Sequence, residues 1–277
     1  MSPPPPAPSL DLISAVILGI VQGVAEFLPI SSSGHLAIGQ ALLDVDPAVG
    51  GLKLNVLLHA GTLLAVLVVF RRDLWELLAS LTPGAGPSNA RAGVVAIIIG
   101  SSPLVLALVP VVEETIIRLA HSMFAVGVAL LCTAVMLGVS HRASPPDDPL
   151  DLAPTRASAL LIGVAQVIAI IPGISRSGAT IAAALGMGMG RERAARFSFL
   201  LSVPAVAAAT LKTGIEFARA PQTSEGSPAP YMIGFLVSFL VGLASLTGLL
   251  RLIRRFGMLP FVPYLIAVGL LSIWMAR

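Results

Sequence analysis

Two short polar stretches interrupt otherwise apolar sequence: GIVQGVAEFLPISSSGH at residues 19–35 and GVAQVIAIIPGISRSGAT at residues 163–180. Two mismatches between these copies carry charge, because Glu26 faces Ile170 and Arg176 faces Ser32. We interpret the pair as one active site divided between the two halves of a duplicated chain. The copies align after a shift of 144 residues, which pairs Gly19 with Gly163, Gln22 with Gln166, Ser31 with Ser175, Ser33 with Ser177 and Gly34 with Gly178.

The composition is that of an integral membrane protein. Apolar residues make up 56% of the 277 residues, charged residues make up 11%, and the mean hydropathy is +0.94. Soluble proteins carry about 25% charged residues. In a membrane protein an excess of Arg and Lys sets the orientation, so the net charge of +3 does not indicate a nucleic-acid partner. The single cysteine, Cys132, excludes an internal disulfide.

Six apolar windows are long enough to cross a bilayer, which takes about 20 residues. Two further apolar regions, 10–45 and 157–190, contain the polar stretches and are interrupted by Pro, Gly and Ser. Irregular backbone is tolerated at membrane depth only where protein or a watery cavity satisfies its polar groups. We therefore expect each region to form a re-entrant helix–loop–helix hairpin. The six windows are 52–70, 92–112, 120–140, 197–217, 230–250 and 259–276.

This order predicts an all-α polytopic membrane protein with an inverted-topology repeat, six spanning helices and two re-entrant hairpins. Three spans follow each hairpin, and because three is odd, the second half must lie upside down relative to the first. The predicted organisation is a disordered Pro-rich tail (1–9), a first repeat (10–142), a linker (143–156) and a second, inverted repeat (157–277).

The basic residues predict which side of the membrane each loop faces. Under this topology one side carries eleven Arg residues and the other side carries five Lys or Arg residues. The richer side is cytoplasmic by the positive-inside rule. Both termini and the entrance to the first hairpin then face outward, and so does the site.

Glu26 is the first candidate for chemistry. A carboxylate in an apolar segment is costly and is a functional candidate by default, and Gln22, four residues earlier, shares its helical face. The helix is expected to end at Leu28, because Pro29 follows it. The alternative is a structural Glu that pairs within the helix bundle.

A Ser cluster and a His follow Glu26. Ser31, Ser32 and Ser33 supply hydroxyl groups, and a helix restarting near His35 would offer its free N–H groups to a phosphate. Helix capping alone would explain any single Ser. His35 stands nine residues after Glu26, and we expect it to act as an acid, a base or a nucleophile.

Arg176 supplies the positive charge that an anionic ligand requires. Arg binds phosphate in a bidentate manner, and in an apolar region it needs an anion, either Glu26 or a ligand. No dedicated metal cage is apparent, but Glu26 and the phosphates could share a bridging Mg²⁺ or Ca²⁺ ion. His59, in Leu-Leu-His-Ala-Gly-Thr62, is interpreted as structural, and the alternative is that it lines the cavity of the site. The residues expected to bind substrate are Gln22, Ser31, Ser33, Gly173, Ser175, Ser177 and Thr180.

These motifs resemble those of the bacterial undecaprenyl-diphosphate phosphatase family, also called bacitracin-resistance proteins. Gln22 and Glu26 match the Gln form of its first motif, which leaves one carboxylate where the alternative form has two. The stretch Pro29–His35 matches its Pro-x-Ser-Ser-x-Gly-His segment. The stretch Pro172–Thr180 matches Pro-Gly-x-Ser-Arg-Ser-Gly-Ala-Thr without interruption. The resemblance covers nearly the whole chain.

The resemblance implies hydrolysis of undecaprenyl diphosphate to undecaprenyl phosphate and inorganic phosphate in the bacterial plasma membrane. This reaction recycles the lipid carrier for cell-wall synthesis and confers bacitracin resistance. Spacing alone does not rank Ser32, His35 or an activated water as the nucleophile, and it leaves a monomer and a homodimer equally open. The implied catalytic residues are Glu26, Ser32, His35 and Arg176.

Two alternative functions use the same residues differently. Inverted repeats with broken helices also occur in secondary transporters, which would need Arg176 but no Glu26–His35 pair. Solute uptake without phosphate release would identify such a transporter. Acid-phosphatase-type lipid phosphatases have a motif that Ser33-Gly34-His35 mimics, but they need a further His, and none follows Arg176 in this chain.

Overall fold

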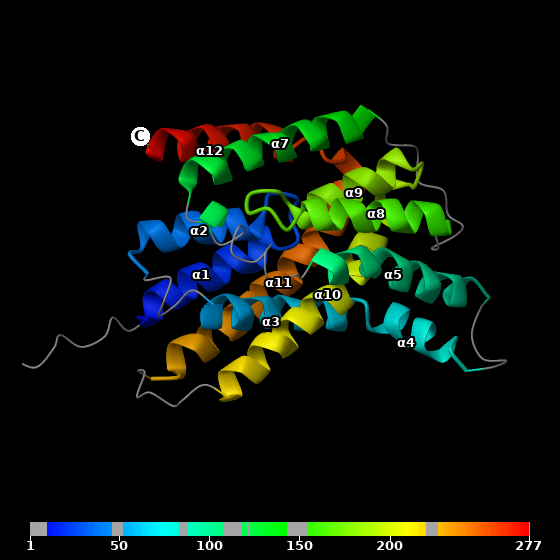
Figure 1. Cartoon of the computed structure of the whole chain (residues 1–277), viewed down its shortest axis with the longest axis horizontal. Helices are drawn as coiled ribbons and strands as arrows, with labels where there is room; N and C mark the ends of the chain where they lie inside the picture. Colours follow the sequence, from blue (N-terminus) through cyan, green and yellow to red (C-terminus); the bar gives the residue numbers. More distant parts are fainter. Residues whose placement is uncertain are drawn as a thin grey trace, which may run out of the picture.

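The computed structural model is helical over its described residues, which are 10–45, 52–82, 88–107, 118–120, 122–142, 154–219 and 227–276. The predicted all-α class is confirmed. The predicted tail 1–9 and most of the predicted linker, 143–153, lie outside the described residues. The first half contains α1 (Leu12–Ala25), α2 (Ser32–Leu42), α3 (Leu52–Val69), α4 (Arg71–Ala79), α5 (Ser88–Ala107) and α7 (Met123–Arg142) (Figure 1). The second half contains α8 (Arg156–Ile168), α9 (Arg176–Gly186), α10 (Arg191–Arg219), α11 (Ala229–Phe256) and α12 (Phe261–Met275).

Three helices of the described chain are long and apolar enough to cross a membrane, namely α7, α10 over Arg191–Lys212, and α11. Helices α3 and α4 add a fourth if the 72° bend between them lies within one span. Each of the six predicted windows contains a helix, but α12 has only 15 residues. This length is about 22 Å, against a hydrocarbon core of about 30 Å. The structure therefore supports a multi-pass membrane protein with three or four clear spans.

Each polar stretch forms two short helices joined by a loop. The helices α1, α2, α8 and α9 have 14, 11, 13 and 11 residues, so none can cross about 30 Å alone. Side-chain caps start them. Asp11 accepts the Ile13 and Ser14 amides at the start of α1, and the Ser14 hydroxyl holds the pKa of the Asp11 carboxyl below its ordinary value. Ser31 caps α2, which begins at Ser32, three residues before the predicted position near His35.

The first helix of each hairpin packs against a helix from the other half of the chain. Helix α1 packs against α11, and α8 packs against α5 (Figure 1). The aligned residues Gly19 and Gly163 make these contacts close. A Cβ atom at Gly19 would lie 2.9 Å from the Gly234 carbonyl oxygen, and one at Gly163 would lie 2.3 Å from the Gly100 oxygen. Small residues at such positions let two helix backbones approach each other.

Gly163→Val is expected to separate α8 from α5, because its side chain would overlap the α5 backbone. Overpacking of this kind costs about 1–3 kcal/mol, and thermal unfolding in detergent would show it as a lower Tm. Gly138→Val is the matched control, since Gly138 also lies inside a helix and its Cβ would meet nothing within 4 Å. Equal Tm values for the two variants would contradict this packing.

Aromatic packing fixes the loop that follows α1. Phe27, which comes directly after Glu26, is fully buried, and its ring meets Phe199 of α10 edge-on at a centroid distance of 5.7 Å. Phe70 is a second neighbour of Phe199, with ring centroids 6.2 Å apart. Edge-to-face aromatic pairs are favourable beyond the area they bury. The core therefore holds the residue next to Glu26 in a defined position.

Helix ends rich in Arg meet at one end of the bundle. Arg254, in the last turn of α11, contacts Glu192 in the first turn of α10 at 2.5 Å. Arg196 of α10 contacts Asp73 in the first turn of α4 at 2.5 Å. These ion pairs join helix ends that the count of basic residues placed on one side of the membrane.

Candidate active site

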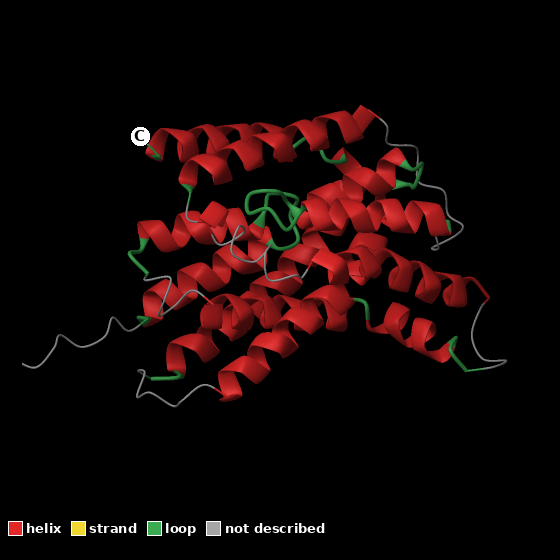
Figure 2. Ribbon diagram, viewed as in Figure 1, coloured by secondary structure: helices red, strands yellow, loops and turns green. Residues whose placement is uncertain are grey.

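The two polar stretches meet at Glu26, whose side chain is only 6% exposed. Arg176, the first residue of α9, donates from Nη2 to Glu26 Oε1 at 2.5 Å, although 150 positions separate the two residues. Ser32, the first residue of α2, donates to Glu26 Oε2 at 2.6 Å. The loops that join α1 to α2 and α8 to α9 come together in the middle of the molecule (Figure 2). The structure thus brings together three of the four predicted catalytic residues.

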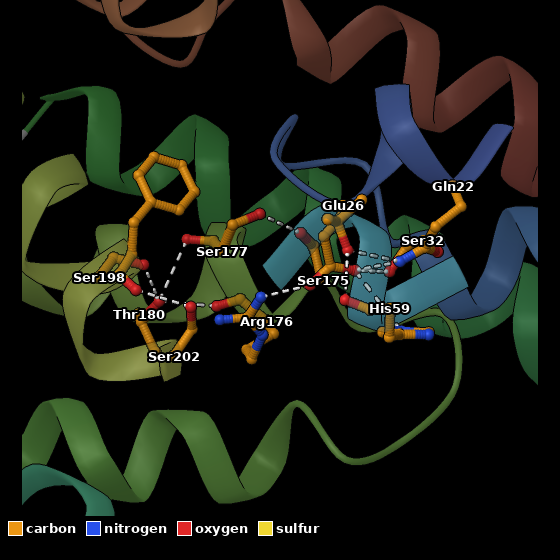
Figure 3. Close-up of polar contacts among 12 residues, drawn as sticks. Gln22, Glu26, Ser32, His59, Ser175, Arg176, Ser177, Thr180, Ser198 and Ser202 are labelled. Atoms are coloured by element: carbon orange, nitrogen blue, oxygen red, sulfur yellow. Dashed lines mark hydrogen bonds and ion pairs between the residues drawn. The ribbon is translucent and has the colours of Figure 1, made fainter. Parts of the chain in front are cut away.

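Helix α3 completes the surroundings of the carboxylate. Gln22 Nε2 donates to Glu26 Oε2 at 3.1 Å and lies 3.3 Å from Thr62 Oγ1. His59 Nε2 lies 3.6 Å from the same Glu26 oxygen (Figure 3). His59 was interpreted as structural from the sequence, and Thr62 was given no role in the site. The sequence feature that could have identified them is the presence of two polar side chains one turn apart inside an apolar window.

The starts of α2 and α9 carry equivalent hydrogen bonds. Ser31 Oγ accepts the Gly34 amide at 3.3 Å, and Ser175 Oγ accepts the Gly178 amide at 3.0 Å. The Ser33 hydroxyl lies 3.3 Å from the Ser31 hydroxyl in α2. The Ser177 hydroxyl lies 3.2 Å from the Ser175 hydroxyl in α9. The first N–H groups of a helix lack partners within that helix and form its positive end. Two such ends therefore meet beside Glu26, where they favour an anion.

His35 lies apart from Glu26. Its Nδ1 is 2.8 Å from the Ser31 carbonyl oxygen, and its Nε2 is 2.8 Å from the Tyr264 hydroxyl. The two rings also stack, with centroids 5.6 Å apart. Ser31 has a φ of 73°, a conformation that costs a non-Gly residue about 1–3 kcal/mol and is typical of functional sites. The expected Glu26–His35 pair is not formed, because His35 points toward α12 and Ser32 occupies the carboxylate.

Two hydroxyls of the second motif bind neighbouring elements. The Thr180 hydroxyl lies 2.5 Å from the Ser198 hydroxyl of α10. The Ser177 hydroxyl donates to the Leu28 carbonyl in the first motif at 3.2 Å. Both residues are buried. They hold the second motif against α10 and against the first motif, and their contact with a substrate stays a prediction.

Thr133 of α7 holds the loop before α9. Its Oγ1 lies 3.1 Å from the Gly173 carbonyl oxygen and accepts the Ser175 amide at 3.2 Å. Gly173 has a φ of 97°, and a Cβ atom there would lie 2.6 Å from the Val126 carbonyl oxygen. The packing against α7 therefore requires glycine at this position. Sequence reasoning did not identify Thr133, which is one polar residue among apolar neighbours.

Two buried polar atoms around Glu26 lack a protein hydrogen-bond partner within the described residues. They are Gln22 Oε1 and Arg176 Nη1. Buried polar groups are nearly always paired with protein or water, so these atoms indicate where a ligand or a water contacts the site. Arg176 can bind an anion through Nη1 while Nη2 faces Glu26.

The site offers few ligands to a metal ion. Over the described part of the chain, no three His, Cys, Asp or Glu side chains come together in a group that could hold an ion. Glu26 is the acid at the centre of the site, and Arg176 already contacts its Oε1. An ion held here would take most of its ligands from a bound substrate or from water.

Comparison with known proteins covers nearly the whole chain. The model of a family described as bacitracin resistance protein BacA matches residues 15–271, a range that includes every site residue described above. Three similar proteins, each named undecaprenyl-diphosphatase, come from Korarchaeum cryptofilum, Geobacter sulfurreducens and Nocardioides sp.. Their sequences are 41%, 40% and 38% identical to this chain, over 94% of it in each case. The alignments cover 98%, 96% and 94% of those relatives.

Proposed function

The chain belongs to the bacitracin resistance protein family, and we propose that it hydrolyses undecaprenyl diphosphate to undecaprenyl phosphate and inorganic phosphate. The observation that carries this proposal is the Glu26 carboxylate, which contacts both Ser32 and Arg176 where two helix N-termini meet. A nucleophile and a phosphate-binding cation therefore each hydrogen-bond to one carboxylate, which can act as the base. The reaction returns the lipid carrier to cell-wall synthesis and confers the resistance for which the family is named.

Ser32 is the nucleophile in this proposal. Its hydroxyl already donates to Glu26 Oε2 at 2.6 Å, whereas both ring nitrogens of His35 contact other groups. Ser32 Oγ attacks the terminal phosphorus, and its proton passes to Glu26. The bond between this phosphorus and the bridging oxygen breaks, and undecaprenyl phosphate leaves. Glu26 releases this proton to solvent. Water then attacks the phosphoserine while Glu26 accepts one of its protons, and this proton passes to Ser32 Oγ as the phosphorus–Oγ bond breaks and inorganic phosphate leaves.

Arg176 and the two helix N-termini stabilise the transferring phosphoryl group. Each N-terminus carries roughly half a positive charge, and Arg176 Nη1 is free to bind a phosphate oxygen. Gln22 Oε1, which is also free, can orient the attacking water. His35 lies one turn beyond Ser32 on α2, and its role is to give a proton to the departing prenyl phosphate.

A bridging Mg²⁺ or Ca²⁺ ion forms part of the proposal. Glu26 would be its protein ligand, and the phosphate oxygens of the substrate would supply most of the others. Such an ion would neutralise charge on the two phosphates.

We place the protein in the plasma membrane with six spans and two re-entrant hairpins. The shortness of α1, α2, α8 and α9 supports the hairpins, because each helix covers only part of the bilayer. The exchange of partners between hairpins supports an inverted repeat. The end where Arg196 and Arg254 gather faces the cytoplasm, so the α1–α2 hairpin and its site open to the outside.

Phosphate release from a C55 prenyl diphosphate by detergent-purified protein tests this function. The wild type should release phosphate, and Ser32→Ala should lower the rate by at least about 100-fold, because Glu26 can then activate only water. A parallel reaction with a chelator measures the dependence on a divalent ion. Absence of release from well-folded wild-type protein would overturn the proposal, and solute uptake into proteoliposomes would then favour a transporter.

A further inference from the structure

The two copies of the motif differ in backbone conformation at one aligned residue. Ser31 and Ser175 both cap a helix through their side chains, but Ser31 has a φ of 73° whereas Ser175 has a φ of −71°. A positive φ is unfavourable for a residue with a side chain, and it persists only where the surrounding structure holds it. A contact that occurs in the first copy alone should therefore explain the conformation of Ser31.

The His35 side chain supplies such a contact. In both copies the carbonyl of the capping Ser accepts the backbone amide four residues later, from His35 in the first copy and from Ala179 in the second. The Ser31 carbonyl oxygen also lies 2.8 Å from Nδ1 of His35. Because a carbonyl oxygen can only accept, Nδ1 carries the hydrogen of this bond. Ala179 has no side-chain donor, so this additional bond is a feature of the first copy.

Tyr264 of α12 holds the other nitrogen of the His35 ring. Its hydroxyl lies 2.8 Å from Nε2, and the two rings stack with an angle of 10° between their planes. A Tyr hydroxyl can donate to a neutral ring nitrogen and accept from a protonated one, so this contact does not depend on the charge of His35. The ring is therefore held at both nitrogens, between α12 and Ser31.

Helix α12 is a well-anchored support for this contact. It packs against α7 (Figure 1), and a Cβ atom at Gly127 of α7 would lie 2.7 Å from the Gly269 carbonyl oxygen of α12. Small residues at such positions let helix backbones approach each other. Helix α7 also holds the loop before α9 through Thr133. The pair of helices therefore contacts both loops of the site, one through Thr133 and the other through Tyr264.

We propose that Tyr264 is a positioning residue that acts on Ser31 through His35. By holding the His35 ring against the Ser31 carbonyl, it keeps Ser31 at its positive φ. This conformation aims the next residue, Ser32, at Glu26 Oε2. The inference rests on the proposed function, in which Ser32 is the nucleophile. It gives the second half of the chain a part in orienting the nucleophile, in addition to binding the phosphate.

Tyr264→Phe removes the hydroxyl and keeps the stacked ring. It should lower kcat by about tenfold, the effect of losing one hydrogen bond, and it should leave the KM for C55 prenyl diphosphate unchanged, because other residues bind the lipid. Tyr231→Phe is the matched control, since it removes the other Tyr hydroxyl of the chain, on α11, and it should keep the wild-type kcat. A wild-type kcat in Tyr264→Phe, or a raised KM alone, would overturn the inference.

A double-mutant cycle shows whether Tyr264 acts through His35. In a His35→Ala background, Tyr264→Phe should have no further effect on the remaining turnover, because the ring that the hydroxyl holds is absent. The same tenfold loss in both backgrounds would mean that the hydroxyl serves only the packing of α12, and the inference would be wrong.

Nitrogen NMR of protein labelled at its four His residues tests the contact without turnover. His35→Ala identifies the signals of His35, and Tyr264→Phe should shift the Nε2 signal of this residue while the other His signals stay in place. An unshifted His35 signal would contradict the inference even if turnover falls. The expected shift in a wild-type protein that releases no phosphate would refute the proposed function and leave the contact between α12 and the first motif intact.

Discussion

Arg176→Ala is expected to lower phosphate release by at least about 1,000-fold, the contribution of an arginine that stabilises a phosphoryl-transfer transition state. The Arg176 side chain is 20% exposed, so water cannot fully replace it beside the substrate. The variant should still insert into membranes, because Arg176 lies at the start of a short helix and not within the Phe27–Phe199 packing. Phosphate release by purified protein at saturating lipid measures the effect.

Two further variants serve as comparisons for Arg176→Ala. Arg176→Lys keeps the charge but not the planar pair of donors, and we expect an intermediate loss of about 10- to 100-fold. Arg196→Ala removes another Arg with a carboxylate partner, Asp73, near the start of α10. It should lower the Tm and leave turnover per folded molecule unchanged. Near-normal turnover in Arg176→Ala would exclude Arg176 from the phosphate site.

The residues that meet at the site could be predicted from sequence because polar groups in apolar segments have few structural explanations. Glu26, Ser32 and Arg176 were each identified by this argument. The duplication added the prediction that distant residues converge. The contact between Arg176 and Glu26, across 150 positions, agrees with that expectation.

The contacts of the two site histidines could not be predicted in the same way. The apolar residues of α3 are spread over all its faces, so their pattern does not indicate which face of this helix turns toward α1. The position of His59 next to Glu26 follows from that packing alone. His35 likewise contacts Tyr264, more than 200 positions away, because α12 returns past the end of the first hairpin.

The number of spans was less predictable than the presence of helices. A hydropathy window measures the length of an apolar run, whereas caps and prolines set where a helix begins and ends. Pro260 immediately precedes the first residue of α12, so this helix is shorter than its window. Helix α4 was not predicted, because its residues lie between the predicted windows 52–70 and 92–112.

Glu26→Gln should lower phosphate release by at least about 1,000-fold, because an amide cannot accept the proton of Ser32. Glu26→Ala should be equally inactive and also less stable, since it removes the shape of the side chain along with the charge that pairs with Arg176. Gln is nearly the size of Glu and can still accept a hydrogen bond from Ser32. The comparison therefore separates the loss of a base from the loss of packing.

The two Glu26 variants also separate catalysis from binding. Glu26→Gln releases Arg176 from its carboxylate, so the affinity for C55 prenyl diphosphate should rise by about tenfold while turnover falls. If a bridging ion is held through Glu26, the wild type should lose activity in a chelator, and the lipid affinity of Glu26→Gln should not change on chelation. Tighter binding without turnover would identify Glu26 as the base whose charge Arg176 balances before substrate arrives. Turnover close to the wild-type rate in Glu26→Gln would remove Glu26 from the chemistry and leave it as a structural partner of Arg176.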